Sequence, residues 1–243
     1  MSSIDPIYGE IRAVVKRNGL DRLGTERSIN ALVSNIISQE RLTKYLKAAG
    51  YDTQRALDLY GWNILISEAF FPVLSASEVC LRNIISSQLV ALYGPTWWDD
   101  AAFLTQIGNG KRIVKTARDK LRKKGAVTSG GMTAELNFGF WVNMLLERHE
   151  PVFWANLHAS FVDLPPAVTY NALYVRCDAV REFRNRVFHH EPILHRNITK
   201  EYSQIMELIT WLSPDKAKWI KQYSRVMTVA RQKPYERLRE TAQ

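Results

Sequence analysis

The apolar residues of this chain recur at helical spacing, and no segment of strand length alternates between apolar and polar residues. This pattern predicts an all-α fold. The longest helical region can be capped by Asp52 or Thr53 and runs through Leu92, where a Gly-Pro pair at 94–95 ends it. Pro72 lies inside this region and is expected to divide it into two helices, because proline has no backbone N–H to continue the hydrogen-bonding pattern.

Shorter helices are predicted along the rest of the chain. The segment 39–49 is expected to end at Gly50, because glycine readily adopts the left-handed conformation that closes many helices. The stretch TSGGM at 128–132 is predicted to be a flexible loop. A chain of 243 residues favours one domain with one substantial core. Further helices are expected near residues 8–17, 26–37, 111–124, 138–147, 168–190, 200–212 and 215–231.

A net charge of +9 favours a polyanionic partner, nucleic acid first, because no lipid-insertion signal accompanies it. The charge is concentrated: residues 111–124 carry +7 and residues 216–243 carry +6, which leaves −4 on the remainder. Such a basic segment is either a solvated helix face or a surface that binds the RNA phosphate backbone without reading its sequence. Four of its residues recur at spacings of 4, 3 and 4 and form one stripe: Lys111, Lys115, Arg118 and Arg122.

The remaining composition indicates a protein of a reducing compartment. Cys80 and Cys177 lie far apart and form no metal-ligand spacing, as is typical of buried thiols. The N-terminal segment lacks the apolar stretch of a secretory signal, and the most apolar stretch, 64–81, contains two glutamates and a proline. We therefore expect a cytoplasmic protein without a membrane span. Five large aromatic residues are expected in the core rather than as base-stacking platforms: Trp97, Trp98, Phe138, Phe140 and Trp141.

The stretch REFRNRVFHHEPILH, residues 181–195, gathers three arginines and three histidines at the end of the predicted helix 168–190. Asn185 and His189 are four residues apart, so the amide is a neighbour that can orient the imidazole. Arg184 and His189 are five residues apart, about 140° on an ideal helix. They converge only if the arginine stem bends, the helix end departs from α geometry, or two copies of the helix meet. The apolar stripe predicted to bury this helix consists of Ala172, Val175, Ala179, Phe183 and Val187.

Three interpretations of this stretch compete. In the first, the stretch is a cationic helix end stabilised by the helix dipole, which is the commonest role for such residues. In the second, the stretch is a zinc site. Against this, HEPILH is one residue longer than the HExxH spacing, and Pro192 breaks the helix that would align the ligands. In the third, the stretch is a metal-independent RNA-cleaving site, in which histidine transfers protons near neutral pH and the planar guanidinium of arginine holds the phosphate. Spacing alone leaves all three open.

The segment RNRVFHHEP, residues 184–192, resembles the Arg-Asn-x-x-x-His signature of the HEPN superfamily, and more narrowly the bacterial abortive-infection (Abi) family. Segments 37–52, 55–89 and 136–145 resemble the same family in the same order. The resemblance covers about 37–212, which implies a helical domain there, an N-terminal helical extension at 1–36 and a basic C-terminal helix and tail at 213–243.

The resemblance implies a HEPN-like helical bundle and a metal-independent endoribonuclease that needs no cofactor and forms a composite site in a homodimer. By motif position, Arg184 stabilises the phosphate, Asn185 orients the histidine and His189 transfers the proton. The family further implies a toxin-like role in phage defence, restrained by a protein or RNA antitoxin. The alternative is a non-catalytic RNA-binding module that keeps the motif as a phosphate clip. Around the motif, Arg82 and Asn83 are expected to contact RNA, and Glu78, Arg181 and His190 to support the site; Glu78 and Arg82 can also form a helix-surface ion pair.

Overall fold

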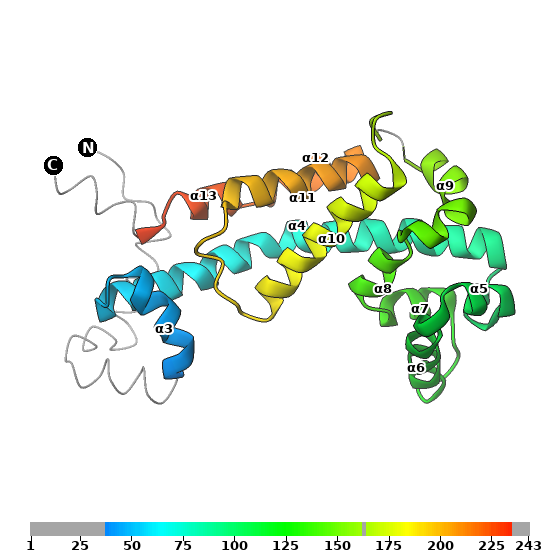
Figure 1. Ribbon diagram of the computed structural model, residues 1–243, viewed down its shortest axis with the longest axis horizontal. Coiled ribbons are helices and arrows are strands. Elements are labelled where there is room, and N and C mark those ends of the chain that lie inside the picture. The colour runs from blue at the N-terminus through cyan, green and yellow to red at the C-terminus, as the bar shows by residue number, and fades with distance from the viewer. Residues whose placement is uncertain (1–36, 162–163, 235–243) are drawn as a thin grey trace. The chain divides into compact units, whose positions relative to one another are not determined.

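The computed structural model describes residues 37–161 and 164–234, and every regular element in these ranges is a helix (Figure 1), which confirms the all-α prediction. The predicted helix 8–17 and nearly all of the predicted helix 26–37 lie outside the described residues. The α-helices are α3 (Gln39–Ala48), α4 (Thr53–Tyr93), α5 (Ala101–Gln106), α6 (Lys111–Arg122), α7 (Ser129–Glu135), α8 (Phe138–Asn143), α9 (Glu150–Ala159), α10 (Tyr170–Phe188), α11 (Ile198–Leu212), α12 (Pro214–Lys221) and α13 (Val226–Ala230).

The chain divides into two compact units, residues 1–62 with 232–243, and residues 63–231. In the first unit, Ser38 caps α3 by accepting a hydrogen bond from the Arg41 N–H, and Gly50 closes the helix at φ +65°, as predicted. The second unit contains every candidate site residue named above. The domain boundaries proposed at 36 and 212 stay predictions.

Helix α4 is one continuous helix of 41 residues, so the prediction that Pro72 divides it is wrong. Buried residues recur every three or four positions on both sides of the proline, including Ile66, Phe70, Val73 and Ser77, so core packing holds one helical register throughout. The carbonyl that Pro72 leaves without its helical donor belongs to Glu68, an exposed residue where water can replace the lost partner. Asp52 caps the helix, as one of the two predicted caps.

Two further predictions are wrong in detail. The TSGGM segment is not a loop but begins α7, because Thr128 Oγ1 accepts a hydrogen bond from the Gly131 N–H at 3.0 Å. A Cβ at Gly131 would lie 3.1 Å from that oxygen, so glycine permits the close approach. The predicted helix 215–231 forms two short helices, α12 and α13, separated by residues 222–225.

The apolar stripe predicted on α10 is correct only in its second half. Val175, Ala172 and Ala179 are exposed, whereas Phe183 and Val187 are buried. The buried face contains Tyr170, Leu173, Cys177, Val180, Phe183 and Val187. The core against which α10 packs includes Phe70 of α4, whose ring centre lies 4.8 Å from that of Phe183. The larger side chains of α10 therefore occupy the interior, and the smaller Ala172, Val175 and Ala179 remain at the surface.

The five aromatic residues predicted for the core are all buried, at no more than 4% exposure. They form edge-to-face contacts, such as that of Trp97 with Trp141, and so join the segments after α4 to α8. Tyr170 adds a buried hydrogen bond from its hydroxyl to the Met144 carbonyl at 2.7 Å. Among the described residues, α4 alone is long and apolar enough to cross a membrane by length and composition. A helix that forms the core of a globular unit passes the same test, and α4 supplies such a core here.

Candidate functional site

Helix α10 ends in a defined C-terminal motif at the two adjacent histidines. His189 is the C-cap, and His190 takes the left-handed conformation with φ 56°. The Glu191 N–H donates to the Arg186 carbonyl at 2.9 Å and the His190 N–H donates to the Val187 carbonyl at 3.1 Å, which is the Schellman pattern. The helix end therefore departs from α geometry directly after His189.

The segment after the motif is anchored on α4. The Ile193 N–H donates to Oδ1 of the buried Asn63 at 2.8 Å, and the side chains of Ile193 and Leu194 are buried. The backbone that carries His189 is consequently fixed on both sides, by α10 before it and by this anchor after it. The imidazole itself is exposed and has no hydrogen bond or ion pair to any residue in the described ranges.

The guanidinium of Arg184 is held by three neighbours. Its Nε lies 3.2 Å from Oε2 of Glu78 on α4, and its Cζ lies 4.2 Å from the ring centre of Phe188. Its Nη1 lies 3.5 Å from Oδ1 of Asn185. The ion pair does not satisfy Nε in hydrogen-bonding geometry, so this buried donor has no hydrogen-bond partner among the described residues. An arginine in this state is oriented and retains bonding capacity for an oxyanion.

The structure thus brings Glu78, Arg184 and Asn185 together and leaves the His189 side chain outside their contacts. The sequence suggested Glu78 and Arg82 as a surface pair, but Glu78 pairs with Arg184 instead. The orienting role of Asn185 toward His189 stays a prediction, because the amide oxygen of Asn185 faces Arg184. Helical spacing predicts neighbours within one helix only. It therefore could not predict that Glu78 of α4 pairs with Arg184 of α10, or that the Asn185 amide lies next to this arginine.

The two other residues expected to contact RNA on α4 differ in environment. Arg82 is half-buried, and its Nε has no hydrogen-bond partner among the described residues. Asn83 is exposed. No contact joins either of them to Arg184 or His189 within the described part of the chain, so their RNA-binding role stays a prediction.

A polar hollow of about 380 Å³ lies beside Asn185 and includes Arg181, Arg186 and Arg196 in its lining. Each arginine already has a carboxylate partner. Nη2 of Arg181 lies 2.6 Å from Asp178, Nη1 of Arg186 lies 3.1 Å from Glu191, and Arg196 pairs with Glu201. Of these arginines, only Arg181 was predicted from the sequence as a site residue. Arg186 lies within residues 181–195, and Arg196 directly follows them.

The basic stripe on α6 divides into free and paired members. Lys111 and Lys115 are exposed and form no ion pair with the described residues. Arg118 pairs with Asp99, and Nη2 of Arg122 lies 3.9 Å from the other oxygen of the same carboxylate. Asp99 therefore neutralises part of the charge that the sequence placed on this stripe, and the pair raises the pKa of Arg118.

A hollow of about 300 Å³ runs along this stripe, and Lys111, Arg112, Lys115 and Arg118 line it together with Trp98 and Leu104. Arg112 was missed because it falls outside the 4-3-4 spacing, although it lies in the same basic run. The hollow gathers four cations, of which Arg118 alone has a carboxylate partner among the described residues. It is the part of α6 best suited to an anionic strand.

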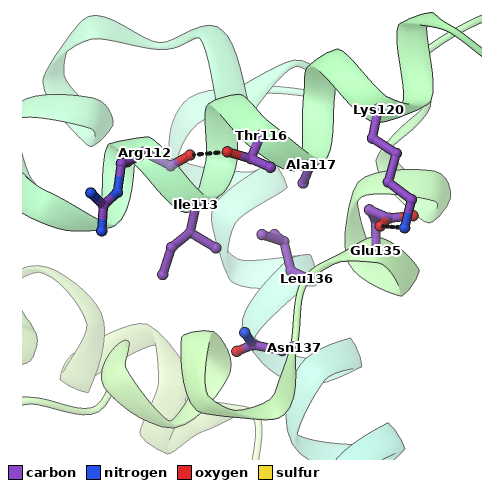
Figure 2. A pocket seen from close by; sticks show the side chains of 8 residues that line it. All are labelled: Arg112, Ile113, Thr116, Ala117, Lys120, Glu135, Leu136 and Asn137. Atoms are coloured by element: carbon purple, nitrogen blue, oxygen red, sulfur yellow. Dashed lines mark hydrogen bonds and ion pairs between the residues drawn. The ribbon is translucent and has the colours of Figure 1, made fainter.

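The opposite side of α6 packs toward α7 and the start of α8 (Figure 2). Figure 2 shows Ile113 and Ala117 on the same side of the hollow, with Leu136 across from them. Lys120 Nζ lies 2.5 Å from Glu135 Oε1 and closes one end. Because this lysine is paired and Ile113, Ala117 and Leu136 are apolar, this side of α6 mainly positions the helix against its neighbours.

The pKa values of both thiols and of one histidine are also shifted. Burial raises the pKa of the Cys177 thiol, which lies fully in the core, and also that of Cys80, so neither is a reactive thiolate. Burial, aided by Arg148, lowers the pKa of His149 to about 4. Within the described residues, no three His, Cys, Asp or Glu side chains cluster in a way that fits a metal ion.

Comparison with known proteins gave no match: no family model, no curated protein and no solved structure is similar to this chain.

Proposed function

We propose that this chain is a metal-independent endoribonuclease of the HEPN type and of the Abi family, active as a homodimer in the cytoplasm. The observation that carries the proposal is the fixed Arg184, five residues before an exposed His189 that lies on an anchored segment and has no partner among the described residues. An oriented guanidinium can stabilise the charged phosphate, and an imidazole open to solvent can transfer the proton, in metal-independent RNA cleavage.

The reaction follows from the chemistry of these groups. His189 of one copy accepts the proton of a ribose 2′-OH, whose oxygen attacks the adjacent phosphorus. The His189 of the partner, in its protonated form, donates a proton to the leaving 5′-oxygen. Arg184 stabilises the additional negative charge on the phosphorane oxygens. The products are a 2′,3′-cyclic phosphate and a 5′-hydroxyl, and no metal or cofactor takes part.

The geometry of a single α10 supports the proposed homodimer. Arg184 is turned toward Glu78 and Phe188, and it makes no contact with the His189 side chain. Two helix ends that meet supply two histidines, one as base and one as acid, and two arginines around one phosphate. Glu78 acts as a positioning residue, because its carboxylate fixes the guanidinium without touching RNA.

The hollow on α6 is proposed to hold the phosphate backbone at a distance from the reaction. Its unpaired Lys111, Arg112 and Lys115 supply sequence-independent affinity that weakens with salt. Such an enzyme cleaves RNA broadly, which suits a toxin-like effector of phage defence. A restraining antitoxin, protein or RNA, is part of this proposal.

A cleavage assay with the purified chain tests the proposal. Arg184→Ala and His189→Ala are each expected to lower the single-turnover cleavage rate at least about 100-fold, the usual contribution of a general acid–base group. His195→Ala is the matched control, because His195 is an exposed histidine of the same segment with no assigned role. Equal cleavage by wild type and both variants contradicts the proposal.

The second candidate, a non-catalytic RNA-binding module, is favoured by one observation. Glu78 offsets the charge of Arg184 in the free protein, whereas α6 keeps unpaired cations. If wild type leaves RNA intact and binds it with the same salt dependence as His189→Ala, this second function holds and the nuclease fails. Analytical ultracentrifugation of wild type at assay concentration decides whether the active species is a dimer.

A further inference from the structure

Exposed aromatic rings gather on one surface of the unit formed by residues 63–231. Phe71 of α4 is 54% exposed, Phe188 at the end of α10 is 37% exposed, and Trp219 of α12 is 47% exposed. Tyr223, just after α12, is 57% exposed. Of the large exposed aromatic side chains in the described ranges, only Tyr51 lies outside this set. Such clustering is unusual, because apolar surface of this size is normally buried or used for binding.

Three of these rings, Phe71, Trp219 and Tyr223, border one groove. A groove of about 340 Å³ separates Phe71, Pro72 and Val79 of α4 from Lys216, Trp219 and Tyr223 on the α12 side. Trp219 and Tyr223 lie with ring centres 5.1 Å apart. The α12 side of the groove therefore presents two neighbouring aromatic rings.

The groove is continuous with the candidate active site. The ring of Phe71 stacks on that of Phe188, with centres 5.8 Å apart and planes inclined by 27°. The guanidinium of Arg184 lies over the other ring of this pair, with its Cζ 4.2 Å from the centre of Phe188. A row of flat groups, Arg184, Phe188 and Phe71, thus leads from the proposed phosphate-binding arginine into the groove.

The charges around the groove suit a polyanion. Lys216 Nζ lies 4.0 Å from the ring centre of Trp219, and Lys221 is exposed on the same helix, whereas Lys218 Nζ lies 3.9 Å from Oδ1 of Asp215. The acidic side chains nearby on α4 are already paired, Glu78 with Arg184 and Glu68 with Arg225. A second copy of this chain placed over α12 would bring these lysines against their own equivalents, which disfavours a symmetric protein contact on that side of the groove.

We propose that this groove, bounded by Phe71, Trp219 and Tyr223 and extended by Phe188, is a stacking platform that holds unpaired bases of an RNA strand next to the phosphate at Arg184. Aromatic rings bordered by cations recognise single strands, because every base offers a flat face to stack on and every nucleotide a phosphate. In a duplex those faces are covered by neighbouring bases. The substrate class is therefore single-stranded RNA. This inference rests on the proposed function for the RNA bound at Arg184.

The platform is tested by binding, separately from cleavage. The probe is a 2′-O-methyl oligouridylate of about ten nucleotides, which lacks the attacking 2′-OH and stays intact with the wild-type protein. Trp219 is exposed while the other six tryptophans are buried or half-buried, so quenching of its fluorescence reports occupation of the groove. We expect quenching by this probe and none by the same sequence in a duplex.

Substitutions separate stacking from charge. Trp219→Leu retains an apolar side chain but removes the ring, and we expect the affinity measured with an end-labelled probe to fall on the order of 10-fold with the salt dependence unchanged. Lys216→Gln is expected to reduce the slope of log affinity against log salt by about 0.7, the value for one phosphate contact on a single strand. Val175→Ala, an exposed apolar site on α10, is the control and is expected to bind as wild type does.

The outcomes are distinguishable. If the probe binds and Trp219→Leu weakens it while no natural RNA is cleaved, the platform stands and the nuclease proposal fails. If RNA is cleaved but Trp219→Leu binds the probe as wild type does, the platform fails. If Trp219→Leu converts a dimer to a monomer in sedimentation with probe affinity unchanged, the surface is a contact between copies of the chain, which overturns the inference.

Discussion

Arg184 of α10 and Glu78 of α4 form an ion pair with Nε and Oε2 3.2 Å apart, although the two residues lie in different parts of the sequence. Both side chains are largely shielded from solvent. In the proposed mechanism the pair fixes the arginine before the phosphate binds, which reduces the ordering required in the transition state. It also makes Glu78 the most informative residue next to the proposed active site.

Glu78→Gln is expected to lower kcat about 10-fold while KM stays equal or falls. The neutral amide orients Arg184 less firmly, but it also removes a negative charge next to the incoming phosphate, which strengthens ground-state binding. Steady-state kinetics on one RNA substrate measure both quantities. Glu207→Gln, which breaks the Arg176–Glu207 pair between α10 and α11, is the matched control and is expected to leave both unchanged. A rise in KM with unchanged kcat contradicts the positioning role.

Asn63→Ala is expected to lower the free energy of unfolding by about 1–3 kcal/mol, because the buried Ile193 N–H loses its acceptor. The same change loosens the segment that carries His189 and is expected to reduce the cleavage rate below wild type under conditions where the variant is folded. Urea unfolding and the cleavage assay measure the two effects. Asn83→Ala, at an exposed amide of the same helix, is expected to change stability by less than about 0.5 kcal/mol. Equal stability of Asn63→Ala and wild type contradicts the anchor.

His149 is expected to make stability fall at mildly acidic pH. Its pKa is about 4 in the folded chain, because it is fully buried and accepts a hydrogen bond at Nε2 from Arg148 Nε at 3.2 Å, whereas an unfolded histidine has a pKa near the ordinary 6.5. Between these values the unfolded chain binds more protons, so this contribution is present above about pH 6.5 and is lost as the pH falls toward 4. From pH 7 to pH 5 the loss is about 2 kcal/mol.

Urea unfolding of wild type and His149→Gln at both pH values isolates this contribution. Carboxylates elsewhere titrate alike in the two proteins, so the difference between them reports His149. The wild type is expected to lose about 2 kcal/mol more than the variant over this range. His158→Gln, on the adjacent α9, is the control and is expected to follow wild type. Parallel losses in wild type and His149→Gln contradict a neutral buried imidazole.

The α6 hollow predicts which cations set the salt dependence of RNA binding. The double variant Lys111→Gln/Lys115→Gln is expected to reduce the slope of log affinity against log salt by about 1.4 for a single strand, about 0.7 for each phosphate contact. Arg122→Gln is expected to reduce it less, because Arg122 already shares Asp99 with Arg118. Fluorescence anisotropy over a salt series measures the slopes. Equal effects of the three positions contradict a selective hollow.

Helical periodicity predicted most of the fold because burial follows it. The all-α class, the closure at Gly50 and the aromatic core around Trp97 and Trp141 follow from local spacing and from the large apolar area of those rings. Pro72 was misjudged because its local cost is smaller than the packing gained by one register on both sides of it. The prediction of a loop at TSGGM is wrong because the Thr128 side chain caps α7, and the two glycines do not prevent this helix from forming.

The candidate site was predictable in identity but not in geometry. The motif names Arg184, Asn185 and His189 by spacing, yet the carboxylate that holds Arg184 comes from another helix, and helical periodicity carries no information on such a partner. The aromatic groove was equally hidden, since Trp219 and Phe71 border the same groove only after α12 packs beside α4. Only the three-dimensional structure shows which side chains from distant parts of the sequence meet at this site.

The most direct test of the central claim is the identity of the RNA ends produced in the presence of EDTA. Wild type is expected to cleave RNA with excess EDTA present and to leave 2′,3′-cyclic phosphate and 5′-hydroxyl ends, while His189→Ala leaves the RNA intact. A single 2′-deoxy substitution at the cleaved nucleotide is expected to abolish cleavage there. Loss of cleavage in EDTA, 5′-phosphate ends, or cleavage that persists in His189→Ala contradicts the account.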